Sequence, residues 1–201
     1  MAVFVSTSIA VWASLFILIA ISWKAQQVEA GKPRVALQFH DMEKCKGVQP
    51  PFEFKNATVV RSKLGSNSIN VDFDNQEVMK TASKLELAVT RCSDAVSFNT
   101  CEYEATLKYS VGLCQLIGSQ TMPWYSILSS MHPPARCPLL IGPYQMRNGT
   151  VDMTSVVKFT GTSYLEQTFG KIFMTVVRIF NEKGSLHVCF TVRYSFMRVR
   201  N

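Results

Sequence analysis

Six cysteines constrain this chain more than any other feature, because all of them follow an apolar N-terminal segment. They are Cys45, Cys92, Cys101, Cys114, Cys137 and Cys189. An even number of cysteines in an exported chain predicts a disulfide framework, which here means three disulfides. No two cysteines are spaced as a Cys-x-x-Cys pair, which argues against a zinc site or a thioredoxin-like motif. We therefore expect a covalently braced domain that holds no metal.

Residues 1–30 predict export. They contain an apolar run, interrupted only by Ser and Thr, that extends to Trp23, and the first charged residue is Lys24. The small and aliphatic residues that end at Ala30 suit a signal peptidase, so we expect the mature chain to begin near Gly31. The run approaches the roughly 20 residues that span a bilayer, and no Lys or Arg precedes it. A retained signal anchor is therefore the alternative to a cleaved signal peptide.

Residues 31–201 contain no linker, repeat or low-complexity tract, so we expect a single domain, either secreted or lysosomal. The sequons at Asn56 and Asn148 are candidate glycosylation sites in an exported chain. The formal net charge of the chain is +7. The basic residues either form an ordinary solvated surface or attract the protein to anionic membranes, an attraction of about 1 kcal/mol per basic residue near the headgroups. Because the basic residues are scattered, nucleic acid is not an expected partner.

An alternation of apolar and polar residues predicts half-buried antiparallel strands along most of the domain. The alternating apolar positions are Val35, Leu37, Phe39, Phe52, Phe54, Ile69, Val71, Phe73, Leu85, Leu87 and Val89. Residues 171–180 and 185–199 flank a short segment that ends in Gly184, which predicts a β-hairpin. The second strand of this hairpin places one stripe on a single face: Leu186, Val188, Phe190, Val192, Tyr194 and Phe196. This stripe is either ordinary core or the wall of a ligand site.

A change of period predicts one short helix from Glu102 to Ile117. Within it Tyr103, Leu107 and Val111 recur every four residues. Together these patterns predict a mainly β fold, an antiparallel β-sandwich or β-cup that encloses an apolar cavity.

Large apolar residues occupy a segment that nearby prolines keep out of regular structure. They are Met122, Trp124, Tyr125, Ile127 and Leu128. One interpretation is a loop folded onto the core. The other is a lip that touches a membrane, where each buried side chain contributes roughly 1.5–3 kcal/mol.

No recognisable catalytic set is present, so we expect no enzyme and no cofactor. Residues 161–165 lack the second glycine of a Gly-x-Ser-x-Gly elbow. His40 and Asp41 are adjacent but have no third partner, and His132 and His187 lie at no metal-ligand spacing.

The order and spacing of the cysteines and their neighbours resemble the ganglioside-activator proteins, members of the wider ML lipid-recognition group. The resemblance covers residues 31–201. It rests on Cys45, the sequon at Asn56, Cys92 with Cys101, Cys114, Cys137-Pro138, Gly142-Pro143-Tyr144, Ser163-Tyr164-Leu165, Gly170-Lys171 and Cys189. The chain lacks an additional cysteine pair of that family, and it has Tyr164 where the activators typically carry Trp.

The resemblance implies a disulfide pairing: Cys45 with Cys189, Cys92 with Cys101, and Cys114 with Cys137. It also implies a second apolar lip, formed by Tyr164, Leu165 and Phe169.

The function that this resemblance implies is binding of a lipid or glycolipid, with transient membrane contact and presentation of the ligand to a glycosidase or receptor. Distantly related insect chemosensory proteins share the general plan. The alternative function is therefore an extracellular chemosensory or interaction protein that binds a small hydrophobic signal.

Overall fold

The computed structural model describes residues 34–61, 67–93 and 100–199, so the expected signal segment lies outside the described residues. The strands are β1 (Arg34–Lys44), β2 (Phe52–Arg61), β3 (Asn67–Asn75), β4 (Ala82–Cys92), β5 (Cys101–Tyr109), β6 (Met131–His132), β7 (Gly142–Gly149), β8 (Ile172–Asn181) and β9 (Leu186–Val199). The helices are α2 (Leu113–Ile117), α3 (Tyr125–Leu128), α4 (Met153–Thr160) and α5 (Thr162–Gln167).

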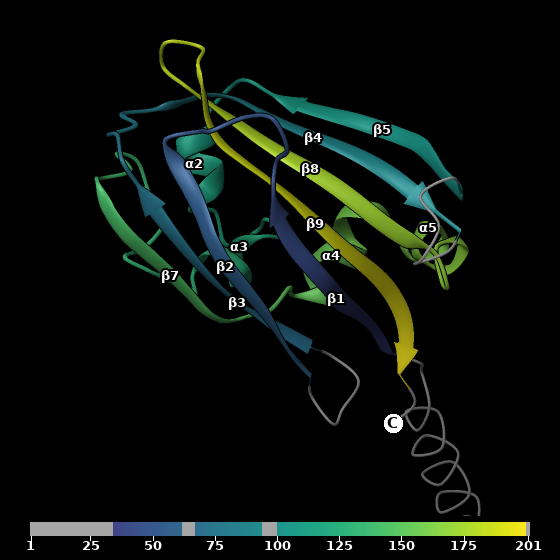
Figure 1. Cartoon of the computed structure of the whole chain (residues 1–201). Coiled ribbons are helices and arrows are strands. Elements are labelled where there is room, and N and C mark those ends of the chain that lie inside the picture. Colours follow the sequence, from purple (N-terminus) through teal and green to yellow (C-terminus); the bar gives the residue numbers. More distant parts are fainter. Residues whose placement is uncertain (1–33, 62–66, 94–99, 200–201) are drawn as a thin grey trace, which may run out of the picture. The chain divides into compact units, whose positions relative to one another are not determined.

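The strands form one sheet in the order β5-β4-β8-β9-β2-β3-β7-β6, and β1 also pairs with β9 (Figure 1). The neighbours along this order pair antiparallel, except that β2 and β9 meet in a parallel contact between Phe52 and Val188. The prediction of a mainly β, mostly antiparallel fold with three disulfides is confirmed.

The alternating sequence patterns form strands because each leaves one apolar face to bury. In β3, burial alternates along the whole strand, and Ile69, Val71 and Phe73 all point into the core. The predicted hairpin is confirmed as β8 and β9. Its turn is held by Asn181, whose Oδ1 accepts hydrogen bonds from the backbone N–H of Lys183 and Ser185, both at 3.0 Å. Gly184 closes the turn with φ 75°, a left-handed conformation that favours glycine.

The prediction of one helix from Glu102 to Ile117 is wrong. Strand β5 occupies the first part of that segment, and only Leu113–Ile117 is helical. Tyr103 is 71% exposed and Val111 is 83% exposed, so their helical spacing does not mark a buried helix face. In addition, four short helices stand in the described part of the chain, where the sequence pattern predicted one.

The three disulfides have the pairing that the resemblance implies. Cys45 bonds Cys189, Cys92 bonds Cys101, and Cys114 bonds Cys137. The first ties the end of β1 to β9, the second joins β4 to β5 at their shared end, and the third joins α2 to the segment that precedes β7.

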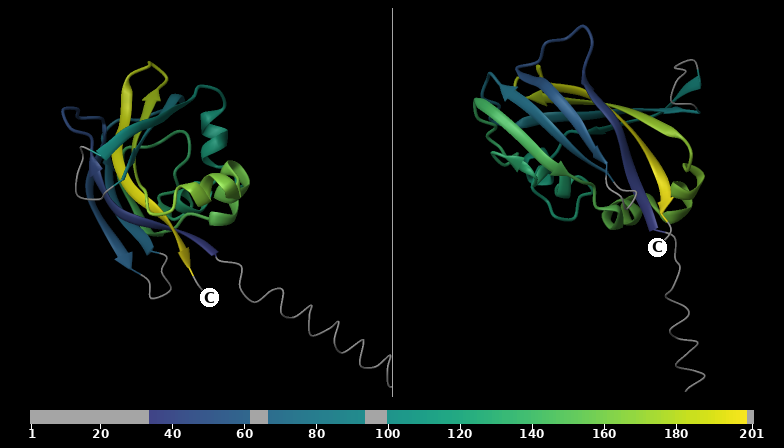
Figure 2. Two further views of the ribbon diagram at one scale, coloured as in Figure 1. Left: turned by 90° about the vertical axis from the view of Figure 1, so that its right-hand side faces the viewer. Right: turned by 60° about the horizontal axis from the view of Figure 1, so that its bottom comes forward.

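Helices α2 to α5 lie on one face of the sheet, as both views in Figure 2 show. We name this the inner face and the opposite side the outer face. Residues 35–199 form one compact unit. Because the helices are short, they cover the inner face in separate places, and this uneven cover decides which side chains stay accessible.

Candidate functional site

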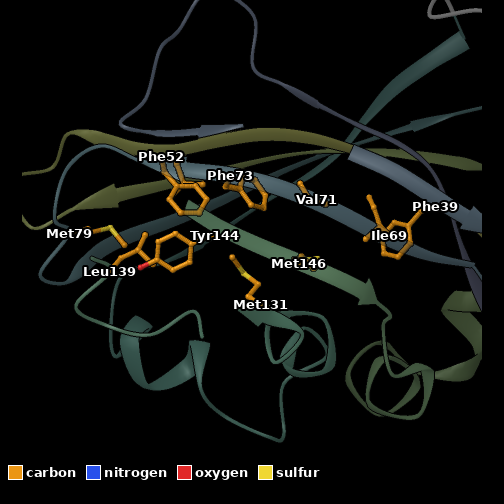
Figure 3. Close-up of a cluster of buried hydrophobic side chains, with 11 residues drawn as sticks. Phe39, Phe52, Ile69, Val71, Phe73, Met79, Met131, Leu139, Tyr144 and Met146 are labelled. Atoms are coloured by element: carbon orange, nitrogen blue, oxygen red, sulfur yellow. The ribbon is translucent and has the colours of Figure 1, made fainter. Parts of the chain in front are cut away.

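The inner face of β2, β3 and β7 is mostly buried: β3 and β7 bury the apolar side chains that they place on it, whereas β2 buries Phe52 and leaves Phe54, Ala57 and Val59 half-buried. The side chains of this face form a cluster with residues of the connecting segments (Figure 3). The buried members are Phe39, Phe52, Ile69, Val71, Phe73, Met79, Met131, Leu139, Tyr144, Met146 and Val188. The rings of Phe52 and Phe73 lie 4.9 Å apart between centroids, and Phe52 and Tyr144 lie 5.5 Å apart. This half of the inner face is ordinary protein core.

The inner face of β4, β5, β8 and β9 is apolar but not covered to the same degree. Leu87 of β4 lies opposite Leu107 of β5 and Val177 of β8, and Val177 lies opposite Phe190 of β9. We name the following set the open apolar face: Leu85, Leu87, Val89, Leu107, Tyr109, Val177, Ile179, Phe190 and Val192. None of these residues is buried, and Leu107 is 41% exposed. Burial along β4 is intermediate at every residue except Cys92, which is buried, and this contrasts with the alternation along β3.

The segment before α3 borders the open apolar face at one end. Trp124 packs edge-on against Tyr109, with ring centroids 6.4 Å apart, and its Nε1–H donates a hydrogen bond to the Leu116 carbonyl at 3.1 Å. Ile127 and Leu128 of α3 pack against the buried cluster of β2, β3 and β7. These contacts hold the segment on the domain.

Helices α4 and α5 cover the opposite end. Val156 of α4 and Leu165 of α5 pack with Phe173 of β8 and Phe196 of β9 in a second buried cluster, and Val89 contacts this cluster. Asp152 is the N-cap of helix α4, and its carboxylate accepts hydrogen bonds from the backbone N–H groups of Thr154 and Ser155. The open apolar face therefore lies between two helical borders.

A polar pair lies within the apolar surroundings of the second cluster. The hydroxyl groups of Thr175 and Tyr194 are 3.2 Å apart, and Tyr194 stacks on Phe173 with ring centroids 5.7 Å apart. Burial raises the pKa of Tyr194, while the hydrogen bond with Thr175 lowers that pKa. Both groups therefore remain neutral hydroxyls at physiological pH.

The residues of the first expected lip are half-buried: Met122, Trp124, Tyr125, Ile127 and Leu128. The residues of the second expected lip differ in exposure. Tyr164 is 40% exposed, whereas Leu165 is 1% exposed and belongs to the second buried cluster. Phe169 is half-buried, and the guanidinium of Arg198 lies over its ring at 4.9 Å.

The stripe on β9 contributes to both halves of the inner face. Val188 is buried in the first cluster, whereas Leu186, Phe190 and Val192 are half-buried. The stripe is thus core at Val188 and part of the open apolar face at Phe190 and Val192.

Sequence reasoning did not select the members of the open apolar face on β4, β5 and β8. Leu87 belongs to an expected strand, but no sequence pattern indicates that the inner face of this strand is left uncovered by helices. Leu107 and Tyr109 fall in the segment where helical spacing predicts a helix, although their alternation with Thr106 and Lys108 is typical of the strand that forms there.

His187 is fully buried, and its Nε2 lies 3.0 Å from Oδ1 of Asn75. Burial lowers the pKa of His187, while the carboxylates of Glu77 and Glu182 raise that pKa. His40 lies on the surface with Nε2 2.9 Å from the Ser195 hydroxyl. Within the described ranges, no group of three or more His, Cys, Asp or Glu side chains is arranged to hold a metal ion.

Both sequon asparagines are exposed, Asn56 on β2 and Asn148 on β7. Where the structure is described, none of the helices combines the length and the apolar character that crossing a bilayer requires.

Comparison of the sequence with models of known protein families gives no match, and comparison with curated proteins finds no significant similarity.

Proposed function

We propose that this protein binds an amphiphilic, lipid-like molecule whose apolar part lies on the open apolar face. The observation that carries the proposal is the row from Leu107 through Leu87 and Val177 to Phe190, which is apolar on four neighbouring strands and buried on none. Each methylene group that a ligand removes from water there contributes about 0.8 kcal/mol.

The geometry also supports a ligand rather than a protein partner. The open apolar face lies on the helix-bearing side of the sheet and is bordered by Trp124 at one end and by α4 and α5 at the other. Borders of this kind favour a slender acyl chain over a large flat partner surface.

Location in an oxidising compartment belongs to the same proposal. Three disulfides and two exposed sequons are compatible with secretion or with the lysosome. Solubilising an amphiphile outside the cytosol is the role that this combination supports best.

A matched pair of valines on β8 tests the proposal. Val177 points to the inner face, and its neighbour Val176 points to the outer face opposite Thr191. Replacing valine by threonine keeps the shape but adds a hydroxyl, whose burial without a partner costs about 1–3 kcal/mol. We expect Val177→Thr to weaken binding of a fluorescent fatty-acyl probe by about 5- to 150-fold.

Val176→Thr is the control and should leave the affinity unchanged. Equal effects of the two substitutions, or the lack of any saturable binding to the folded wild-type protein, would show that the open apolar face is not a ligand site.

A further inference from the structure

The open apolar face ends in polar residues at the border with α5. The polar side chains at this end are Arg91 on β4, Glu104 on β5, Thr175 on β8 and Tyr194 on β9. Thr175 lies in the same row as Val89 and Val192, the last members of the open apolar face. The registers place Arg91 opposite Phe173, and Phe173 opposite Tyr194, so these positions lie at the same end of neighbouring strands. The inner face thus has an apolar body and one polar end.

Tyr164 of α5 completes this polar end. Burial, followed by the carboxylate of Glu104, raises the pKa of Tyr164, while the guanidinium of Arg91 lowers that pKa. The next residue, Leu165, is buried in the second cluster, against which Tyr194 also packs, so α5 brings Tyr164 to this end of the sheet. We name Arg91, Glu104, Tyr164, Thr175 and Tyr194 the polar end of the site.

The charges at this end are unequal. Nε of Arg91 lies 3.3 Å from Oε2 of Glu104, and Nη2 of Arg91 lies 3.9 Å from Oε2 of Glu102. One guanidinium therefore faces two carboxylates, and the same end of the sheet carries the hydrogen-bonded hydroxyl groups of Thr175 and Tyr194. An anionic group placed here is repelled by the surplus carboxylate. A neutral hydroxyl group finds both donors and acceptors.

We propose that the polar end receives the head of the bound amphiphile and selects a neutral head that carries hydroxyl groups over an anionic head. This inference rests on the proposed function, because it assumes that the acyl chain lies on the open apolar face. The chain then runs along β4 and β8, with its polar end toward α5.

Two ligands that share one acyl chain test the selection. Monopalmitoylglycerol has a neutral head with two hydroxyl groups, and palmitate has an anionic carboxylate. In displacement of a fluorescent fatty-acyl probe at neutral pH, we expect monopalmitoylglycerol to bind more tightly, on the order of tenfold. Both ligands are used below the concentration at which they form micelles.

Glu104→Gln removes one negative charge from the polar end without changing its size. We expect this variant to bind palmitate more tightly than the wild-type protein does. The ratio of the affinities for monopalmitoylglycerol and palmitate should therefore fall, on the order of tenfold. Glu86→Gln is the matched control, because Glu86 is on the outer face of β4 and pairs with Lys84 at 3.1 Å. It makes the same change of net charge away from the site. Tyr164→Phe should weaken monopalmitoylglycerol binding and leave palmitate binding nearly unchanged.

The outcomes separate this inference from the proposed function. If wild-type protein binds palmitate as tightly as monopalmitoylglycerol, or if Glu104→Gln and Glu86→Gln act alike, the polar end does not select the head. In that case a loss of affinity in Val177→Thr still supports acyl-chain binding on the open apolar face. If neither ligand displaces the probe, or if the probe itself does not bind, the proposed function is refuted, and the inference about the head group is refuted with it.

Discussion

Trp124→Ala distinguishes a side chain that is part of the domain from one that forms a membrane lip. Replacing a fully buried tryptophan by alanine costs about 3–5 kcal/mol, and Trp124 is half-buried. That cost includes the hydrogen bond to the Leu116 carbonyl, about 0.5–1.5 kcal/mol, and the aromatic pair with Tyr109, which contributes a similar amount. We expect the free energy of unfolding to fall by about 2–3 kcal/mol.

Thermal denaturation followed by circular dichroism, with the disulfides intact, measures this loss. For a domain of this size the expected decrease in Tm is about 5–10 °C. Tyr103→Ala is the control, because Tyr103 lies on the same strand as Tyr109 but is 71% exposed, so its loss should change stability by less than about 0.5 kcal/mol.

A double-mutant cycle isolates the contact between the two rings. Trp124→Ala and Tyr109→Ala together should destabilise less than the sum of the single changes, by about 0.5–1.5 kcal/mol. The reasoning is refuted if Trp124→Ala leaves the Tm unchanged while weakening binding to lipid vesicles, since that result identifies a membrane-touching lip.

Three further predictions concern stability. Burial lowers the pKa of His187, so below about pH 6.5 the unfolded chain takes up a proton that the folded chain binds less readily. Urea titrations should therefore show stability falling from pH 7 to pH 5, and falling less in His187→Gln. His40→Gln is measured in parallel because burial also lowers the pKa of His40. Removing the disulfide by Cys45→Ala with Cys189→Ala should cost about 2–5 kcal/mol in the same titration, because it frees a span of 144 residues in the unfolded chain. Asp152→Ala should cost about 1 kcal/mol by removing the N-cap of α4, whereas Asp152→Asn should retain most of the stability.

The strands whose apolar side chains are buried on one face were predictable from the sequence. The alternation at Ile69, Val71 and Phe73 is a local pattern, and β3 buries it without exception. The hairpin of β8 and β9 was equally predictable, because Gly184 provides the turn that joins two apolar runs.

The segment from Glu102 to Ile117 was misread because two periods overlap in it. Tyr103, Leu107 and Val111 have helical spacing, but β5 is fixed by its pairing with β4 and by the disulfide between Cys92 and Cys101. These are contacts with another strand, which a periodicity within the segment does not reveal.

The extent of burial on the inner face could not be predicted either. Leu87 and Val71 are both apolar residues at alternating strand positions, yet Val71 is fully buried and Leu87 is not. The difference depends on where α3, α4 and α5 lie, and these helices come from distant parts of the chain. The sequence therefore predicted β1 to β4, β8 and β9, but neither β5 nor the uncovered half of the face that these strands share.

The bond between Cys45 and Cys189 determines how the domain responds to mechanical force. The beginning of β1 and the end of β9 lie side by side (Figure 1), so tension applied to the two ends of the domain would unzip these strands from each other. Extension would stop at the disulfide, after the release of roughly 70 Å of chain at about 3.5 Å per residue. Leu87, Leu107 and Val177 lie within the covalently closed ring and are not part of the released chain. A reducing agent would open the ring, so a pulling experiment should show a short extension without the reducing agent and a long extension with it.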